Sequence, residues 1–169
     1  MTSIMNRRIE HLDLSHNAFG PDGVKSFQEF LSICPSLKVL NVTNCGLGPK
    51  GGEMIAEAIE KNPNMKLTEF YASRDRLEQE GLEALSKVFS KQKCLEKIEV
   101  YQNGSKEGLK FLLASFVDCK ATLKSVNIQD NKSINKAIPE LATFIKECNN
   151  VEYLNISDLK MTKSNCVII

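Results

Sequence analysis

Apolar residues recur along this chain in one short pattern: an apolar residue, two variable positions, a second apolar residue, one variable position and a third apolar residue. Six copies begin at intervals of 28, 30, 28, 28 and 28 residues, and they cover 9–14, 37–42, 67–72, 95–100, 123–128 and 151–156. Because alternate side chains of a strand point to opposite faces, each copy predicts a short strand with its apolar residues buried. The residues expected on the other face include Asp13, Asn41, Tyr71, Glu99, Asn127 and Asn155.

A turn and an amphipathic helix are predicted between consecutive strands. The segments 20–23, 48–51, 78–81 and 105–108 carry the glycines and prolines of turns, and apolar residues such as Leu82, Leu85 and Phe89 follow at helical spacing. Two extra residues in the longer interval fall around 62–64, in a helix-to-strand loop. One strand and one helix every 28 to 30 residues predict an α/β leucine-rich repeat solenoid of about six repeats. In this horseshoe, parallel strands form the concave face and helices form the convex face.

We interpret residues 1–169 as a single leucine-rich repeat domain without terminal caps. The first strand pattern begins at Ile9, and the nine residues from Met161 to Ile169 are too few for a helix like the preceding ones. A solenoid normally ends in capping repeats with a polar outer face. We therefore interpret the chain as the central part of a longer horseshoe, or as one whose ends are covered by something else. Self-association through the uncapped ends is a further alternative.

Composition argues against several classes of partner. The 22 basic and 21 acidic residues give a net charge of +1, which provides no general attraction for nucleic acid or an anionic membrane. No signal peptide and no apolar run of membrane-spanning length is present, so we expect an intracellular protein. The six cysteines form no C-x-x-C pair, and His11 and His16 are the two histidines. Reduced cysteines and no metal site are expected.

Polar residues gather where each strand pattern ends. One position, expected to form a ladder of hydrogen bonds between repeats, holds Asn17, Cys45, Asp75, Asn103, Asn131 and Leu159. The position before it holds His16, Asn44, Arg74, Gln102, Asp130 and Asp158, so six polar groups are predicted along one rim of the horseshoe. Taken without other information, these six residues have the composition of ordinary solvated turns.

Other motifs carry less weight. Gly46-x-Gly48 with Lys50 lacks the Gly-Lys-Ser or Gly-Lys-Thr ending of a phosphate loop, and no catalytic triad can be assembled, so neither intrinsic catalysis nor a cofactor is expected. The last four residues, starting at Cys166, have the form of a prenylation box, but isoleucine is an unusual final residue. We favour the solenoid interpretation, in which Asn165 takes the place of a turn glycine and 167–169 begin the next helix.

The turns 14–21 and 44–52, followed by 74–78, 101–104 and 128–131, resemble successive repeat signatures of the Ran GTPase-activating protein family, which activates the nuclear-transport GTPase Ran. The resemblance implies a GTPase activator that is not itself an enzyme and whose partner is Ran in its GTP-bound form. It also implies a cytoplasmic location, including the nuclear envelope, and no membrane or nucleic-acid partner.

By this resemblance, Asn44 corresponds to the asparagine that orients the catalytic glutamine of the GTPase, without an arginine finger. Arg76 coincides with a family arginine, and Arg74 lies two residues before it; for Arg74 an ordinary surface charge is an equal alternative. Three further residues are expected to contact the GTPase: Gln102, Asn103 and Asp130. The competing hypothesis is a binding module or inhibitor without activation, which grips a protein through concave residues including Tyr71, Tyr101 and Tyr153.

Overall fold

The strands form one parallel sheet in chain order. The computed structural model describes residues 8–104, 107–132 and 134–167. The strands are β1 (His11–Asp13), β2 (Val39–Asn41), β3 (Glu69–Tyr71), β4 (Lys97–Glu99), β5 (Ser125–Asn127) and β6 (Tyr153–Asn155). They are hydrogen-bonded in the order β1-β2-β3-β4-β5-β6, with every neighbouring pair parallel. The predicted repeats are therefore confirmed, each contributing one strand.

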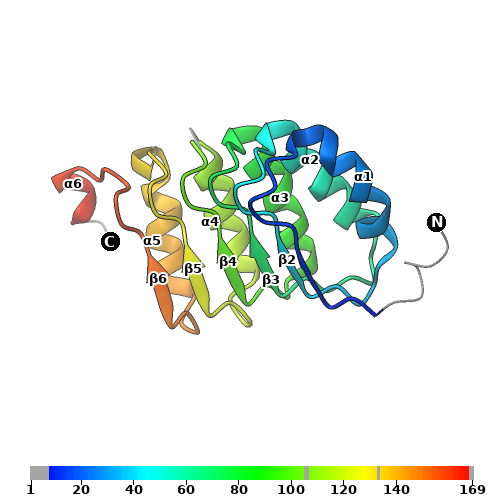
Figure 1. Cartoon of the computed structure of the whole chain (residues 1–169). Helices are drawn as coiled ribbons and strands as arrows, with labels where there is room; N and C mark the ends of the chain where they lie inside the picture. The colour runs from blue at the N-terminus through cyan, green and yellow to red at the C-terminus, as the bar shows by residue number, and fades with distance from the viewer. Residues whose placement is uncertain (1–7, 105–106, 133, 168–169) are drawn as a thin grey trace.

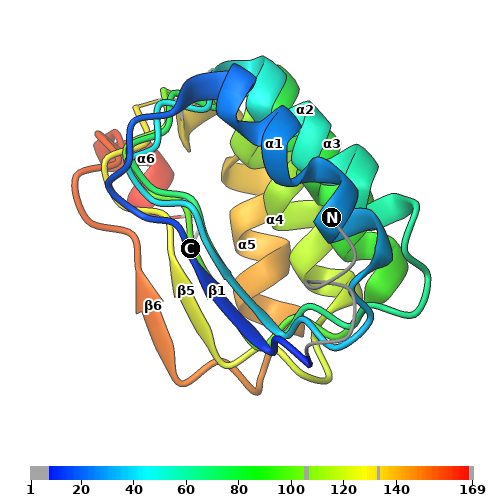
Figure 2. The same cartoon turned by 45° about the vertical axis from the view of Figure 1, so that its right-hand side comes forward.

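Helices cover one face of this sheet, as Figures 1 and 2 show. They are α1 (Gly20–Ile33), α2 (Gly48–Glu60), α3 (Glu78–Gln92), α4 (Gly108–Asp118), α5 (Ile138–Glu147) and the short α6 (Lys163–Cys166), with a 3-10 turn η1 (Ile134–Lys136) before α5. From α1 to α5, each helix contacts the next one in the chain. The molecule is thus a two-layer slab built from successive strand-helix units.

The strand register explains the core. The middle residue of every strand pairs with the middle residue of the next, which aligns Leu40, Phe70 and Ile98 in one fully buried row. Aromatic rings join the layers and the repeats: the ring centroids of Phe70 and Phe89 lie 5.4 Å apart, and those of Phe116 and Phe144 lie 5.6 Å apart. The apolar face of each unit is buried mainly against its neighbours, as the repeat predicts.

The helix boundaries differ from the sequence prediction. Residues 20–23, 48–51 and 78–81, predicted as separate turns, form the first turn of α1, α2 and α3. Prolines fit there because the first N–H groups of a helix have no intrahelical partner. Near the C-terminus, α6 already includes Asn165, so a helix beginning at 167 is wrong. Residues 105–106 of the fourth predicted turn and 168–169 lie outside the described residues.

Two further findings concern membranes and cysteines. No helix in the described part of the chain is both long and apolar enough to cross a bilayer. The cysteines are unpaired, and Cys34, Cys45, Cys119 and Cys148 are buried, whereas Cys166 is exposed. Burial raises the pKa of the Cys119 thiol to about 11, so this side chain behaves as a small apolar residue of the core.

Candidate functional site

The residue that precedes the ladder position has the same unusual backbone in every repeat. Its φ is positive in all six: His16 (62°), Asn44 (57°), Arg74 (60°), Gln102 (57°), Asp130 (50°) and Asp158 (52°). The N–H of Asn44 donates to the Ser73 carbonyl at 2.8 Å, and the N–H of Arg74 donates to the Tyr101 carbonyl at 2.9 Å. These bonds extend the parallel ladder beyond the strands and hold the six residues in a line, which we call the rim row.

Positive φ at residues with a side chain is uncommon outside glycine, and the left-handed conformation costs about 1–2 kcal/mol for each residue. Glycine would occupy these positions without that cost. None of the six rim-row residues is glycine. The rim row therefore presents six side chains, from residues in an uncommon backbone conformation, along one edge of the sheet.

The middle of the rim row lines a shallow hollow of about 380 Å³. Its lining residues are Asn44, Arg74, Arg76, Gln102, Gly104, Asp130 and Lys132. Three of these side chains are cationic and one is anionic. Neither Arg74 nor Arg76 forms an ion pair within the part of the chain that the structure describes, and both side chains are exposed. The hollow is thus a positively charged depression suited to acidic groups of a partner.

Asn44 is half-buried at one end of this hollow. Its Nδ2 lies 3.2 Å from Nδ1 of His16, the preceding member of the rim row. When that ring nitrogen accepts the hydrogen bond, the amide is fixed and its Oδ1 points away from the ring. The contact with His16 uses the amide nitrogen, so the amide oxygen of Asn44 remains an acceptor for an approaching protein.

Five of the six site residues predicted from the sequence line this hollow, and the sixth, Asn103, does not. Asn103 is fully buried in the ladder, where its Nδ2 donates to the carbonyls of Ala72 at 2.8 Å and Val100 at 3.0 Å. Its side chain cannot also contact a GTPase, so the prediction is wrong for this residue. The physical reason is the strand-end geometry, which turns the ladder residue inward and its predecessor outward.

Lys132 was not predicted and completes the charge of the hollow. It follows Asp130 at the same spacing by which Arg76 follows Arg74. That spacing is visible in the sequence, and it would have identified the lysine had the second outward position of each turn been considered. Among the described residues, no group of three or more His, Cys, Asp or Glu side chains is placed to hold a metal ion.

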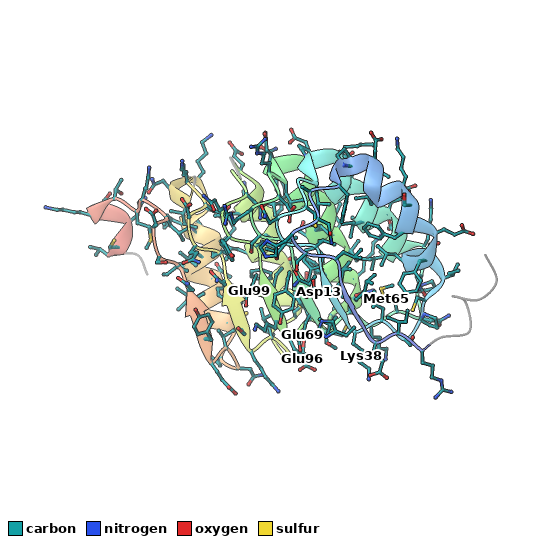
Figure 3. The ribbon with its side chains drawn as sticks, in the orientation of Figure 1. Asp13, Lys38, Met65, Glu69, Glu96 and Glu99 are labelled. Carbon is teal, nitrogen blue, oxygen red and sulfur yellow. The ribbon has the colours of Figure 1, made fainter. Side chains whose placement is uncertain are left out.

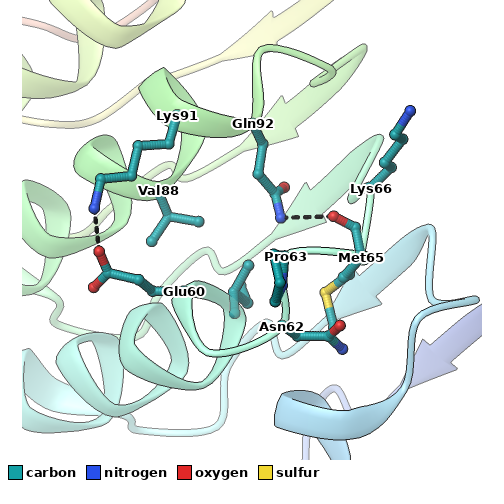
Figure 4. A pocket seen from close by; sticks show the side chains of 9 residues that line it. Glu60, Asn62, Pro63, Met65, Lys66, Val88, Lys91 and Gln92 are labelled. Carbon is teal, nitrogen blue, oxygen red and sulfur yellow. Dashed lines mark hydrogen bonds and ion pairs between the residues drawn. The ribbon is translucent and has the colours of Figure 1, made fainter.

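A second hollow, of about 290 Å³, lies near the ends of α2 and α3 and beside the two-residue insertion (Figure 4). Ile59, Met65 and Val88 provide apolar walls. Two pairs of polar groups at its edge bond to each other: Lys91 pairs with Glu60, and Gln92 Nε2 donates to the Met65 carbonyl at 3.0 Å. This hollow lies where two repeats of unequal length meet. Because these polar groups already bond to each other, the hollow is a weaker candidate for a binding site than the first one.

The strand face carries several acidic side chains, and Figure 3 labels Asp13, Glu69, Glu96 and Glu99 on this side of the molecule. Much of their bonding capacity is used internally. The Tyr71 hydroxyl donates to Glu69 at 2.5 Å, and Lys97 Nζ lies 3.3 Å from Glu99 and 5.1 Å from the centre of the Tyr71 ring. Tyr153 is the most exposed of the three tyrosines that the competing hypothesis uses, at 52%.

Comparison with known proteins agrees with the repeat architecture. A leucine-rich repeat family model matches residues 6–27 and 34–56. The chain is 39% identical to Ran GTPase-activating protein 1 of Xenopus laevis over 107 residues, which are 57% of this chain and 18% of that protein. It is 37% identical to the Ran GTPase-activating protein of Drosophila melanogaster over 124 residues, which are 67% of this chain and 21% of that protein.

The repeats are also similar to those of a different class of protein. The chain is 30% identical to NACHT, LRR and PYD domains-containing protein 4C of Mus musculus over 129 residues, 75% of this chain and 13% of that protein. The chain thus spans about a fifth or less of the length of these relatives. The identities of 39% and 37% to two Ran GTPase-activating proteins confirm the resemblance that the turn motifs indicate.

Proposed function

We propose that this chain, a leucine-rich repeat protein that matches part of the Ran GTPase-activating proteins, binds Ran in its GTP-bound form through the rim row and accelerates GTP hydrolysis. The observation that supports this most directly is Asn44. It is held in a left-handed turn, its amide nitrogen lies 3.2 Å from Nδ1 of His16, and it borders a cationic hollow.

In the proposed mechanism, this chain performs no covalent chemistry. The GTPase carries the nucleotide, Mg²⁺ and the glutamine that orients the attacking water, and Oδ1 of Asn44 accepts a hydrogen bond from that glutamine amide. Phosphoryl transfer depends largely on positioning and electrostatic stabilisation, so restricting one glutamine to its productive orientation accelerates the reaction. No arginine of this chain enters the active site in this mechanism.

Arg74, Arg76 and Lys132 act in recognition. Their charges surround the hollow beside Asn44, and the described residues provide only Asp130 as an anion there. Such a depression attracts acidic side chains of the partner and speeds the first encounter. Gln102 supplies an uncharged contact in the same depression.

The first test is single-turnover GTP hydrolysis by Ran with the chain added, compared with Asn44→Ala. We expect the variant to lose about a hundredfold of the acceleration while binding is largely retained, because a mispositioned catalytic group costs about that factor. The matched control is Asn64→Ala, which removes an exposed asparagine from the insertion loop at the opposite edge. Equal acceleration by the wild-type chain and Asn44→Ala would contradict the proposed role.

A binding module without activation is the second candidate. The similarity to a NACHT, LRR and PYD domains-containing protein supports it, because similar repeats occur in a protein whose name describes no GTPase activation. In this case Ran hydrolysis is unchanged by the chain, Asn44→Ala has no effect, and substitution of the exposed Tyr153 weakens binding to the partner.

A further inference from the structure

The ladder beneath the rim row contains two asparagines with the same bonding pattern. Asn103 Oδ1 accepts the N–H of Asp75 at 3.1 Å, and Asn131 Oδ1 accepts the N–H of Asn103 at 2.9 Å. Each Nδ2 then donates to two strand-end carbonyls at 3.0 Å or less and lies 3.4 Å from a third; for Asn131 the two short bonds go to Val100 and Ile128, both at 2.9 Å. Both asparagines therefore use one side-chain acceptor and one side-chain donor in the ladder.

Asp75 occupies the same ladder position and supplies the acceptor. Its Oδ1 accepts the N–H groups of Cys45 at 2.7 Å and Gly46 at 2.9 Å, and that of Leu47 at 3.5 Å. These N–H groups belong to the turn that presents Asn44. The Asp75 side chain is fully buried, and its Oδ2 has no hydrogen-bond partner.

Asp75 Oδ1 accepts two N–H groups of the preceding turn that correspond to those bonded by Asn103 Oδ1, so the unpartnered Oδ2 takes the place of the asparagine Nδ2. By the register of the ladder, the carbonyls corresponding to those bonded by Asn103 and Asn131 are the ones of Val42 and Ala72. A carboxylate oxygen there would face carbonyl oxygens without a proton between them, which is unfavourable in a buried site. A carboxylic acid would supply the missing donor and complete the pattern.

We infer that Asp75 is a neutral carboxylic acid in the folded chain in mildly acidic solution, that its Oδ2–H then donates to a strand-end carbonyl, and that Asp75 is the positioning residue of the Asn44 turn. The part concerning Asn44 rests on the proposed function. The protonation itself does not, because it follows from the ladder geometry alone.

Burial supports this protonation state, since it raises the pKa of Asp75 from 3.8 to about 6 even though the N–H groups of the Cys45 turn oppose the shift. In the unfolded chain the group has its ordinary value. The raised pKa therefore stabilises the fold fully below pH 3.8, and the contribution is lost as the pH rises from about 4 to about 6. The whole change corresponds to about a hundredfold in the unfolding equilibrium constant.

Other ionisable groups near Asp75 must be separated from its effect. The Cys45 thiol lies on the preceding turn, and its pKa is raised by burial and further by a charge on Asp75. Arg74 and Arg76 flank Asp75 on its own turn, and the ladder neighbour on the next turn, Asn103, does not ionise. The rim row adds Asp130 and His16, of which His16 contacts Asn44 directly.

The protonation state of Asp75 can be tested on this chain alone, without the GTPase. The Asp75 carboxyl is titrated by carbon NMR in the whole chain, and urea unfolding is followed from pH 4 to pH 7 for wild type and Asp75→Asn. We expect a titration midpoint near 6. The unfolding constant of wild type relative to Asp75→Asn should rise about a hundredfold across this range. A carboxyl that titrates at or below 4, or parallel pH profiles of the two proteins, would overturn the inference.

A transplanted acid provides the matched control. Asn131→Asp places a carboxyl in an equivalent buried ladder position, and it should introduce the same loss of stability between pH 4 and pH 6 that Asp75→Asn removes. His16→Asn, measured in parallel, eliminates the imidazole as the source of the pH dependence. An Asn131→Asp variant whose stability follows wild type at every pH would show that the ladder does not select the protonated acid.

Ran hydrolysis then tests the positioning role. The acceleration by wild type relative to Asp75→Asn should fall as the pH rises, with a midpoint near 6, because the ionised Oδ2 no longer donates to the strand-end carbonyls, one of which, that of Val42, lies two residues before Asn44. If neither protein accelerates hydrolysis, the proposed function fails while the NMR titration still decides the protonation state. If both accelerate it with a constant ratio, the proposed function stands and the positioning role is wrong.

Discussion

At the scale of single residues, the strand-end turns separate two tasks that adjacent positions perform. The residue facing inward, such as Asn103, forms hydrogen bonds with main-chain groups of adjacent turns. The residue facing outward has a left-handed backbone and a side chain that a partner can contact. The sequence indicated both positions for Asn44 and its equivalents. It could not indicate that Asn103 is unavailable to a partner, because Asn is equally suited to a buried ladder and to a solvated turn.

Arg76 offers a way to separate recognition from stability. Its φ is 55°, and the corresponding positions of two other turns hold glycines, Gly46 at 69° and Gly104 at 66°. In Arg76→Gly, relief of the left-handed strain is offset by the greater freedom of the unfolded chain, so we expect the unfolding free energy to stay within about 1 kcal/mol. Affinity for Ran should fall, because the hollow loses a charge.

The control for this change is Lys160→Gly. Lys160 has a φ of 55° in the last turn and does not line the hollow, so the substitution makes the same backbone change and removes the same charge elsewhere. Isothermal titration calorimetry with GTP-bound Ran and urea unfolding measure the two effects. Equal losses of affinity in both variants would argue that net charge, rather than the hollow, decides recognition.

At the scale of the elements, the helices begin earlier and pack closer than hydrophobic spacing alone predicts. The glycines of the predicted turns lie inside the first helical turn, where they allow neighbouring helices to approach. A Cβ on Gly52 of α2 would lie 2.9 Å from the Gly81 Cα of α3 and 2.9 Å from Leu77 Cδ2. The absence of a side chain at Gly52 is therefore needed for the close contact between α2 and α3.

Gly52→Ala should consequently destabilise the protein, although alanine favours a helix more than glycine does. Forcing a methyl group against main-chain atoms in a packed interface costs about 1–3 kcal/mol. Urea unfolding measures the change, and Lys87→Ala on the exposed surface of α3 serves as a control that is expected to cost less than about 0.5 kcal/mol. A stabilised Gly52→Ala would show that the two helices move apart freely.

At the scale of the whole molecule, the chain is a row of units in which each helix contacts its chain neighbours. Its stability is therefore expected to behave as a sum of unit terms and nearest-neighbour interfaces. The ring pair of Phe116 in α4 and Phe144 in α5 is one such interface, and both side chains are fully or almost fully buried. Damage at this interface should spread only to adjacent units before the whole slab unfolds.

Phe116→Ala tests this local coupling. Removal of a buried aromatic ring lowers the unfolding free energy by about 3–5 kcal/mol. Native-state hydrogen exchange should show the largest loss of protection in α4 and α5, a smaller loss in α3 and the least in α1. An equal loss in all helices would mean that the row unfolds as one cooperative unit.

The sequence by itself determined the number of repeats, the strand positions, the parallel order and the rim that carries Asn44, because a fixed period forces each unit to bury the same face against the next. Only the tertiary structure decided which polar residues can contact a partner and which are buried. Asn103 lies inside the ladder, Lys132 joins the hollow, and Asp75 is left with an unsatisfied buried oxygen. These outcomes depend on distances across neighbouring turns, which no single repeat contains.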